Sequence, residues 1–269
     1  MSTNICSGIS GKAHSAANIY LGVDGRARAV TAVYAGVGGR ARSVWKTNPP
    51  DPVFGQNSWE EIGRAIARNR IPESWAVGSE KDLTLTDGTV LPMVICGVNH
   101  DDLATGKKAS FTLGMVNLLP EARALNPTAT NAGSFAASAA YSWLNGPFWK
   151  TLPPDFQAIV KPARKKTGAG ALSREILVQE MPLFLFSEFE VLGAATTASP
   201  PGEGEAYPIF SAGRPARIKR TPETNTPGTW WTRSPHLGGA DRFCAISVLG
   251  MQGSFGANLP YYLSFACCI

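Results

Sequence analysis

The first 46 residues repeat one pattern three times, and this repeat limits the possible fold of that segment more than any other feature of the sequence. The copies begin at Ile5, Ile19 and Val33, which are 14 residues apart. Self-similarity at a fixed period indicates one structural unit used several times. Each copy carries two glycines between β-prone residues, such as Gly22 and Gly25, and this arrangement predicts a tight turn that joins two very short strands.

A hairpin made from one 14-residue copy is too small to bury its own apolar face. It must therefore pack on its neighbours, on the rest of the chain or on other subunits. We expect residues 1–46 to form an anchor or assembly module of short β-hairpin repeats, and the alternative is a flexible leader. The basic residues of the repeats alternate along one predicted strand and indicate a basic stripe that faces an acidic partner or water. These residues are Lys12, Arg26, Arg28, Arg40 and Arg42.

A proline-rich linker, residues 47–52, separates the repeats from the rest of the chain. Three of its six residues are proline, which stops regular structure and keeps the backbone extended. We therefore place the domain boundary there and expect residues 53–269 to form a second domain. With 44% apolar residues the chain can build a core, and its 28 glycines and 20 prolines indicate many turns and short strands.

Two local signals in the second domain predict regular elements. Residues 57–71 place apolar side chains at helical spacing, with Ser58 as the N-cap and Glu61 three residues later, which is the pattern of a capping box. An Asp-Gly pair at residues 87–88 lies between two β-prone segments and predicts a hairpin.

The rest of the second domain is expected to alternate short elements with long loops. A second helix is predicted over residues 132–144, and residues 181–193 predict a buried strand followed by a polar turn. The remaining predictions are a short helix and then a strand within residues 152–166, a loop over residues 194–229, and short strands within residues 229–235, 242–250 and 261–269. Two main helices with several short strands predict an α+β domain with small antiparallel sheets.

The charge and cysteine content argue against several classes of protein. The net charge of +5 is spread along the chain, and the two basic runs, residues 161–166 and 214–220, contain no aromatic residues. Such short runs are typical of solvated loops, so nucleic-acid binding is not expected. Five cysteines without regular spacing do not form a disulfide framework, and the N-terminus lacks a signal pattern or a membrane-spanning stretch. We expect a protein that folds in a reducing cytoplasm, where virion parts are also assembled, without membrane insertion.

Five separated blocks of the second domain carry a resemblance to a known family. They are NSWEEI (residues 57–62), VICGVNHDD (94–102), SAAYSWLN (138–145), PLFLFSEFEVLG (182–193) and TWWTRSP (229–235), and an apolar strand ends the chain. Over residues 53–269 the chain resembles an uncharacterised domain family common in bacteriophages, prophages and gut bacteria, whose hallmark is a WWLRSP-like motif near the C-terminus. Thr232 stands where leucine is usual, and residues 261–269 depart from the usual Gly-Val-Arg-Pro-Ala-Leu run.

The resemblance implies a fold and a role. That family is similar to the C-type-lectin-like fold, in the branch of the formylglycine-generating enzymes and of the variable proteins of diversity-generating retroelements, which present a variable C-terminal surface to host receptors. For this chain it implies an adhesin of the phage tail that binds a protein or glycan receptor on the host-cell surface. It also implies contacts of the N-terminal repeats with other virion proteins, a homo-oligomer such as a trimer, and no cofactor.

The segment over residues 236–262 is the main part of the predicted ligand-binding surface. It mixes rigid aromatic residues with small polar ones, which is the composition of adaptable binding loops. The residues predicted to contact a ligand are Thr232, His236, Asp241, Arg242, Ser247, Leu249, Gln252, Ser254, Phe255, Asn258, Tyr261 and Tyr262.

A structural motif precedes this surface. Trp230 and Trp231 occupy adjacent strand positions and face opposite sides, so one is expected in the core while the other lines a groove. Arg233 is expected to pair with Glu188 or Glu190 and to lock the C-terminal loop.

A metal or nucleophile site is the weaker interpretation of one further cluster, formed by Cys96, His100, Asp101 and Asp102. Zinc sites use paired ligands, and no second pair is present, so a turn at the end of a strand is the simpler interpretation. The sequence also lacks an EF-hand-like acidic loop for calcium, and no metal site is predicted.

Two other functions stay open at this point. One is an enzyme on the same fold that acts on the cell surface, such as a hydrolase, with Asp101, Asp102, Glu188 and Glu190 as its candidate acids. The other is a purely structural virion protein that keeps the repeat and lacks a receptor site.

Overall fold

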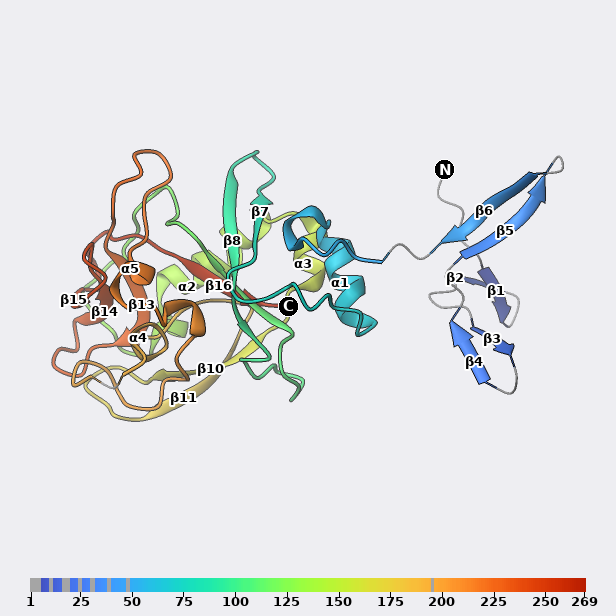
Figure 1. The fold of residues 1–269 in the computed structure, drawn as a ribbon. Coiled ribbons are helices and arrows are strands. Elements are labelled where there is room, and N and C mark those ends of the chain that lie inside the picture. Colours follow the sequence, from blue (N-terminus) through green and yellow to red (C-terminus); the bar gives the residue numbers. More distant parts are fainter. Residues whose placement is uncertain are drawn as a thin grey trace. The chain divides into compact units, whose positions relative to one another are not determined.

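The computed structural model describes residues 49–194 and 196–269 in full and, before residue 49, the backbone of six strands. Contacts between residues divide the chain into two compact units, Met1–Pro49 and Pro50–Ile269. Figure 1 shows both units.

In the first unit each copy of the repeat forms one antiparallel hairpin. The strand pairs are β1 (Cys6–Ile9) with β2 (Lys12–Ser15), β3 (Tyr20–Val23) with β4 (Arg26–Ala29), and β5 (Ala32–Val37) with β6 (Arg40–Lys46). Gly22 lies within β3, opposite Ala27, so the prediction that both glycines form the turn is wrong for the first of them. The β-prone residues on either side of Gly22 keep it in the ladder. The turn residues and the side chains of the predicted basic stripe lie outside the described part of the chain.

The helices described in the second unit are short. They are α1 (Trp59–Ala67), α2 (Ala139–Trp143), α3 (Pro154–Ile159), α4 (Glu188–Leu192) and α5 (Arg214–Arg217). Single 3₁₀ turns lie at Phe54–Gln56, Phe135–Ala137, Trp149–Thr151 and Pro208–Phe210, and a π turn follows α2 at Leu144–Phe148. Among the described residues, no helix has the length and apolar character needed to span a membrane.

The capping box predicted at Ser58 is confirmed, and it opens α1. The Glu61 N–H donates to Ser58 Oγ at 3.2 Å, and the Ser58 N–H donates to Glu61 Oε2 at 2.8 Å. These bonds satisfy two donors that a helix start would otherwise leave without partners. The helix then packs its apolar face against α3, where the rings of Trp59 and Phe156 lie 4.7 Å apart between centroids.

Two antiparallel sheets form the framework of the second unit. The larger has the order β12-β16-β9-β8-β7 and consists of β7 (Glu80–Thr84), β8 (Val90–Val98), β9 (Phe111–Met115), β12 (Leu183–Leu185) and β16 (Phe265–Cys268). The smaller has the order β13-β14-β15 and consists of β13 (Trp230–Pro235), β14 (Arg242–Ile246) and β15 (Gln252–Gly256). A separate hairpin pairs β10 (Ala163–Gly168) with β11 (Ile176–Met181).

These elements make the chain an α+β protein with few helices and several small antiparallel sheets, as the sequence predicted. The strands β9 and β16 are buried throughout, so the end of the chain lies in the core of the larger sheet. Figure 1 shows the smaller sheet on the opposite side of the second unit from α1. The last part of the chain therefore contributes both to the core and to an outlying sheet.

The prediction of a helix over residues 132–144 is wrong for the first half of this segment. Gly133 and Ser134 have φ angles of +79° and +72°, which no α-helix accepts. The helix begins only after Ser138, whose Oγ accepts from the Tyr141 N–H at 3.1 Å. It then continues beyond residue 144 as the π turn.

The polar turn predicted within residues 181–193 is a helix, α4. Ser187 and Glu190 form a second capping box, because the Glu190 N–H donates to Ser187 Oγ at 3.0 Å and the Ser187 N–H donates to Glu190 Oε2 at 2.9 Å. The serine-x-x-glutamate spacing is the one that predicted α1, and it is the signal that could have located this helix. The loop predicted over residues 194–229 is also interrupted, by α5 and one 3₁₀ turn.

Candidate functional site

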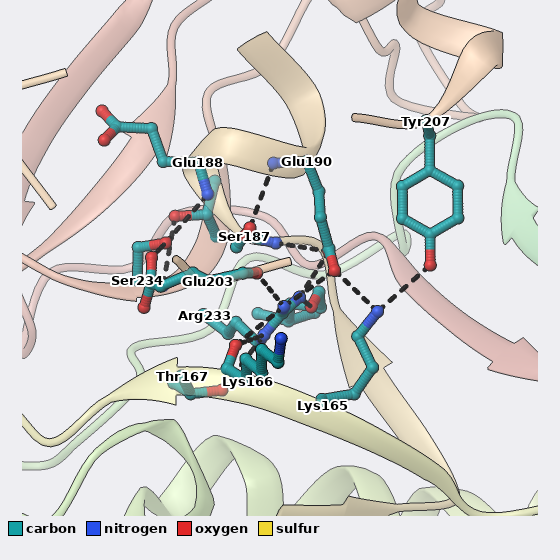
Figure 2. Close-up of polar contacts among 12 residues, drawn as sticks. Lys165, Lys166, Thr167, Ser187, Glu188, Glu190, Glu203, Tyr207, Arg233 and Ser234 are labelled. Atoms are coloured by element: carbon teal, nitrogen blue, oxygen red, sulfur yellow. Dashed lines mark hydrogen bonds and ion pairs between the residues drawn. The ribbon is translucent and has the colours of Figure 1, made fainter. Parts of the chain in front are cut away.

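Buried ionisable residues gather around Arg233 of β13, and we call this group the charged cluster. Its members are Asp101, Lys165, Glu190, Glu203 and Arg233. Arg233 is at its centre (Figure 2), and its guanidinium donates to both carboxylate oxygens of Glu190, at 2.5 and 2.8 Å. It also donates to backbone carbonyls of three separate segments, at Lys166, Leu185 and Glu203. One side chain therefore ties β13 to β10, to β12, to α4 and to the loop that follows α4.

Lys165 is the second cation of the charged cluster. It is only 2% exposed, and its Nζ lies 2.6 Å from carboxylate oxygens of both Asp101 and Glu190. The Tyr207 hydroxyl accepts from Lys165 at 3.1 Å and donates to Asp101 at 2.5 Å. The prediction that residues 161–166 form a solvated loop is wrong for this position, because β10 alternates buried and exposed residues and Lys165 takes a buried position.

Among residues 49–194 and 196–269, no cation is bound to the carboxyl group of Glu203. Arg233 contacts the Glu203 backbone carbonyl, whereas the carboxyl group accepts from the Gly168 N–H at 2.7 Å and bonds the Ser234 hydroxyl. Burial raises the pKa of Glu203 to about 7. This carboxyl group therefore keeps its proton under mildly acidic conditions.

The two other carboxylates of the charged cluster are ionised. Burial alone would raise the pKa of Asp101 and of Glu190, but Lys165 beside Asp101, and Arg233 with Lys165 beside Glu190, hold both pKa values below the ordinary range. Two anions thus balance two cations while Glu203 is protonated. Displacing β13 would leave buried charges without partners, so the charged cluster fixes this strand in place.

Arg233 selects Glu190 from the two glutamates that the sequence offered. Residues two positions apart on a helix point to different sides, so α4 directs only one of the pair toward β13. Glu188 is also buried, and it accepts from the hydroxyls of Thr196 at 2.6 Å and Ser199 at 2.5 Å. Both glutamates therefore bind neighbouring parts of the fold.

The Asn-His-Asp-Asp segment after β8 forms a bend. Asn99 has a φ of +49°, which ends the strand. The His100 ring stacks on Tyr207 at 4.0 Å between centroids, and Asp101 joins the charged cluster. Asp102 forms an exposed ion pair on the surface. The four residues thus divide between a bend, the interior and the surface.

Both tryptophans of the motif are buried, so the prediction that one of them lines a groove is wrong. The Trp230 indole N–H donates to the Arg217 carbonyl and the Trp231 indole N–H donates to the Arg123 carbonyl, both at 3.1 Å. The segments that carry these two carbonyls cover the opposite faces of β13. A strand covered on both faces has no side chain left for a groove.

The predicted ligand-binding residues lie mostly at the surface of β14, β15 and the adjoining loops. Eleven of the twelve are exposed or half-buried: His236, Asp241, Arg242, Ser247, Leu249, Gln252, Ser254, Phe255, Asn258, Tyr261 and Tyr262. Thr232 is the exception, because it is fully buried and its Oγ1 donates to the Cys244 carbonyl at 2.9 Å. Thr232 therefore belongs to the support beneath the surface and is not a ligand contact.

Two half-buried aromatic rings join this surface to the motif beneath it. The ring centroid of Trp231 lies 5.4 Å from that of Tyr261 and 6.5 Å from that of Phe255. The rings of Phe255 and Tyr261 lie 4.5 Å apart. Edge contacts of this kind hold aromatic side chains in fixed positions. The surface rings are therefore held by a buried residue of β13.

Asn131 organises the loop beside the surface, although no sequence signal points to it. Its side-chain N–H groups donate to the carbonyls of Gly239 at 3.0 Å and Arg242 at 2.7 Å. Its side-chain oxygen accepts from the Ala171 N–H at 2.7 Å. A single buried asparagine has no periodicity, so only the folded structure shows that it holds these loops together.

Within residues 49–194 and 196–269, no three His, Cys, Asp or Glu side chains are grouped as ligands for a metal ion. No curated protein and no solved structure matches the chain. A family model described as a domain of unknown function, DUF6273, matches residues 103–268, which is more than half of the chain. The match includes the whole smaller sheet and every residue of the charged cluster except Asp101. The chain belongs to the DUF6273 family.

Proposed function

We propose that the chain is a binding protein that presents the outer residues of β14, β15 and their loops to a receptor. The observation that carries this proposal is the position of eleven accessible residues on and around β14 and β15, of which β14 pairs with β13, the strand that Arg233 and the charged cluster hold. Binding residues are often found on segments that a rigid scaffold positions. Side chains on such a surface can differ without changing the fold beneath them.

The chemistry of the surface also supports a binding role. Phe255, Tyr261 and Tyr262 supply half-buried aromatic area, and Gln252 and Asn258 supply exposed amides. Aromatic side chains bind with little loss of conformational entropy, and small polar side chains adapt their hydrogen bonds to the ligand. This combination suits recognition of a protein or a glycan.

The proposed role is non-catalytic. Three of the acids considered for an enzyme, Asp101, Glu188 and Glu190, bind neighbouring parts of the fold, and their roles in the structure account for their positions. A catalytic acid needs to reach its substrate as well as to have a suitable pKa. Their buried contacts therefore favour support of the surface over turnover.

We further propose that the protein acts in a bacteriophage tail, as an adhesin with a C-type-lectin-like domain. The support for this setting is the resemblance of the five sequence blocks to phage and prophage domains. The hairpin repeats of residues 1–46 would join the protein to other virion components. A homo-oligomer such as a trimer would raise the avidity of weak single sites for the host cell.

Binding to whole cells tests the proposal. The full chain is labelled with a fluorophore and incubated with a panel of bacterial strains, and exposed side chains are removed in the separate variants Arg242→Ser, Gln252→Ala and Asn258→Ala. We expect the unchanged chain to bind at least one strain and at least one variant to bind about tenfold more weakly. The control is Val178→Thr, which changes a side chain of β11 that is 51% exposed. Binding to no strain, or equal binding by all three variants, would contradict the proposal.

A further inference from the structure

β15 is the outer strand of the smaller sheet, and half of its backbone groups point away from β14. The Ser247 N–H donates to the Met251 carbonyl and the Ala257 N–H donates to the Asp241 carbonyl, both at 2.8 Å. These two bonds lie at opposite ends of the β14–β15 ladder and fit the same register. Opposite residues in an antiparallel ladder alternate between bonded and non-bonded pairs. The odd-numbered residues of β15 therefore bond β14, and the even-numbered residues direct their N–H and C=O groups outward.

Two residues of this edge offer their backbone groups to a partner. The outward carbonyl of Gly256 already accepts from the Leu259 N–H at 3.0 Å. In the described part of the chain, the outward N–H and C=O groups of Gln252 and Ser254 have no hydrogen-bond partner. Gln252 is exposed and Ser254 is half-buried. The edge therefore presents free backbone donors and acceptors at alternate residues. This is the arrangement through which one strand bonds the next strand of a sheet.

β15 also lacks the features that usually protect an edge strand. Natural sheet edges carry charged residues, prolines or bulges, which prevent pairing with another chain. The edge strand β7 of the larger sheet follows this rule, with Glu80, Lys81 and Asp82. In contrast, β15 has no charge and no proline, and the whole segment from Phe243 to Ile269 contains no charged residue and no histidine.

Exposed apolar side chains flank the same edge. Val248, Leu249 and Met251 precede β15 and are 42%, 64% and 41% exposed, and Leu259 follows it and is 42% exposed. Large apolar side chains that gather at one exposed site indicate a surface for a partner. Their position at both ends of β15 extends the area that an added strand would cover.

We propose that the edge of β15 binds an extended polypeptide segment as an additional strand, and that this segment is uncharged over about five residues. This inference rests on the proposed binding function and names the class of its ligand. An extended polypeptide repeats its N–H and C=O groups about every 6.8 Å along one side, which matches the alternation along β15. Its lack of charge fits the uncharged edge, because a charged side chain placed there would lose water without gaining a partner. A glycan has no backbone with this alternation, so a protein receptor is the better fit.

An array of random-sequence nonapeptides tests the inference, with a glycan array beside it. The labelled full chain is compared with Ser254→Pro, which removes one outward N–H and keeps the bonds that residues 253 and 255 make to β14. Ser254→Ala is the matched control, because it changes the side chain and keeps the N–H. Gln252→Pro removes the other outward N–H and serves as a second backbone variant. Circular dichroism and urea denaturation show which variants are folded.

We expect the unchanged chain to bind a subset of peptides without charge at their central positions. Ser254→Pro is expected to bind these peptides about tenfold more weakly than Ser254→Ala, and Gln252→Pro about tenfold more weakly than the unchanged chain. The inference would be overturned if the unchanged chain bound only glycans or bound no peptide. It would also be overturned if the proline variants bound peptides as well as the unchanged chain does, or if Ser254→Ala lost as much binding as Ser254→Pro.

The whole-cell assay separates this inference from the proposed function. If Ser254→Pro binds cells as well as the unchanged chain does while Arg242→Ser or Asn258→Ala binds weakly, the surface binds a receptor without strand addition. If the unchanged chain binds no cells, the proposed function itself fails.

Discussion

Replacement of Glu203 by glutamine tests the charge balance of the buried cluster. In the fold the Glu203 carboxyl group accepts from the Gly168 N–H and bonds the Ser234 hydroxyl. The amide oxygen of a glutamine can accept from Gly168, and its NH₂ group can donate to the Ser234 hydroxyl, which then accepts as it would from a protonated Glu203. Glu203→Gln therefore copies the protonated form of the side chain and cannot ionise.

The size of the effect follows from the pKa of Glu203. Burial raises this pKa from its ordinary value of 4.5 to about 7. Each pKa unit corresponds to about 1.4 kcal/mol, so the bound proton contributes up to about 3 kcal/mol to the free energy of unfolding. Between pH 4.5 and about pH 7 the native state holds the proton, whereas the unfolded chain has lost it. The free energy of unfolding therefore falls as the pH rises through this window and levels off above it.

Urea denaturation followed by tryptophan fluorescence, from about pH 4.5 to about pH 8.5, measures the effect. We expect similar stability for both proteins at the acidic end and about 3 kcal/mol more for Glu203→Gln at the basic end. Glu205→Gln changes an exposed side chain nearby and is expected to follow the unchanged chain. Parallel profiles for the unchanged chain and Glu203→Gln would refute the reasoning, because the native fold would then hold no extra proton at this residue.

Three further predictions concern the stability and the packing of the second unit. Arg233→Met leaves Glu190 without its main cation and is expected to lower the free energy of unfolding by about 3–5 kcal/mol, of which the double variant Arg233→Met/Glu190→Met recovers most. Equal losses in the single and double variants would show that the buried charge is not the cause. Ser58→Ala removes the cap of α1 and is expected to cost about 1 kcal/mol in the same denaturation assay, and an unchanged midpoint would contradict this role. In a Cys6→Ser background, we expect Ellman's reagent to label none of the four buried thiols until the fold is denatured. Burial raises the pKa of Cys96 to about 12, for example, and blocks access; prompt labelling of one thiol under native conditions would disagree.

The elements that the sequence predicted correctly have causes that lie within a few residues. The capping box at Ser58 and the Asp-Gly turn at residues 87–88 bring donors and acceptors together locally, and β7 pairs with β8 as expected. The spacing of Ser187 and Glu190 is an equally local signal for α4, so this helix was within reach of the same reasoning. The start of the helix within residues 132–144 could not be predicted in this way, because an alanine-rich periodic pattern does not reveal the positive φ angles that precede the helix.

The charged cluster could not be predicted in full, because its partners are far apart in the chain. Asp101 and Lys165 are separated by 64 residues, and Glu190 and Arg233 by 43. A single sequence shows which residues carry charge and not which of them meet. The sequence predicts only that Arg233 pairs with Glu188 or Glu190. The choice between them depends on the direction in which α4 points each side chain.

Charge in the second unit is distributed in a way that hydropathy alone does not anticipate. Lys165, Lys219 and Arg233 are buried, whereas the segment from Phe243 to Ile269, which includes β15, carries no charge at all. Burial lowers the pKa of Lys219 to about 8, and its ammonium group donates to two carbonyls at the end of β9. Lys219 and Arg233 thus bind backbone carbonyls, which is a role that neutral side chains fill less strongly. An uncharged edge does not attract a partner over long distances. Recognition along β15 must therefore come from direct contact, in which main-chain hydrogen bonds set the register and the surrounding aromatic and apolar side chains select the ligand.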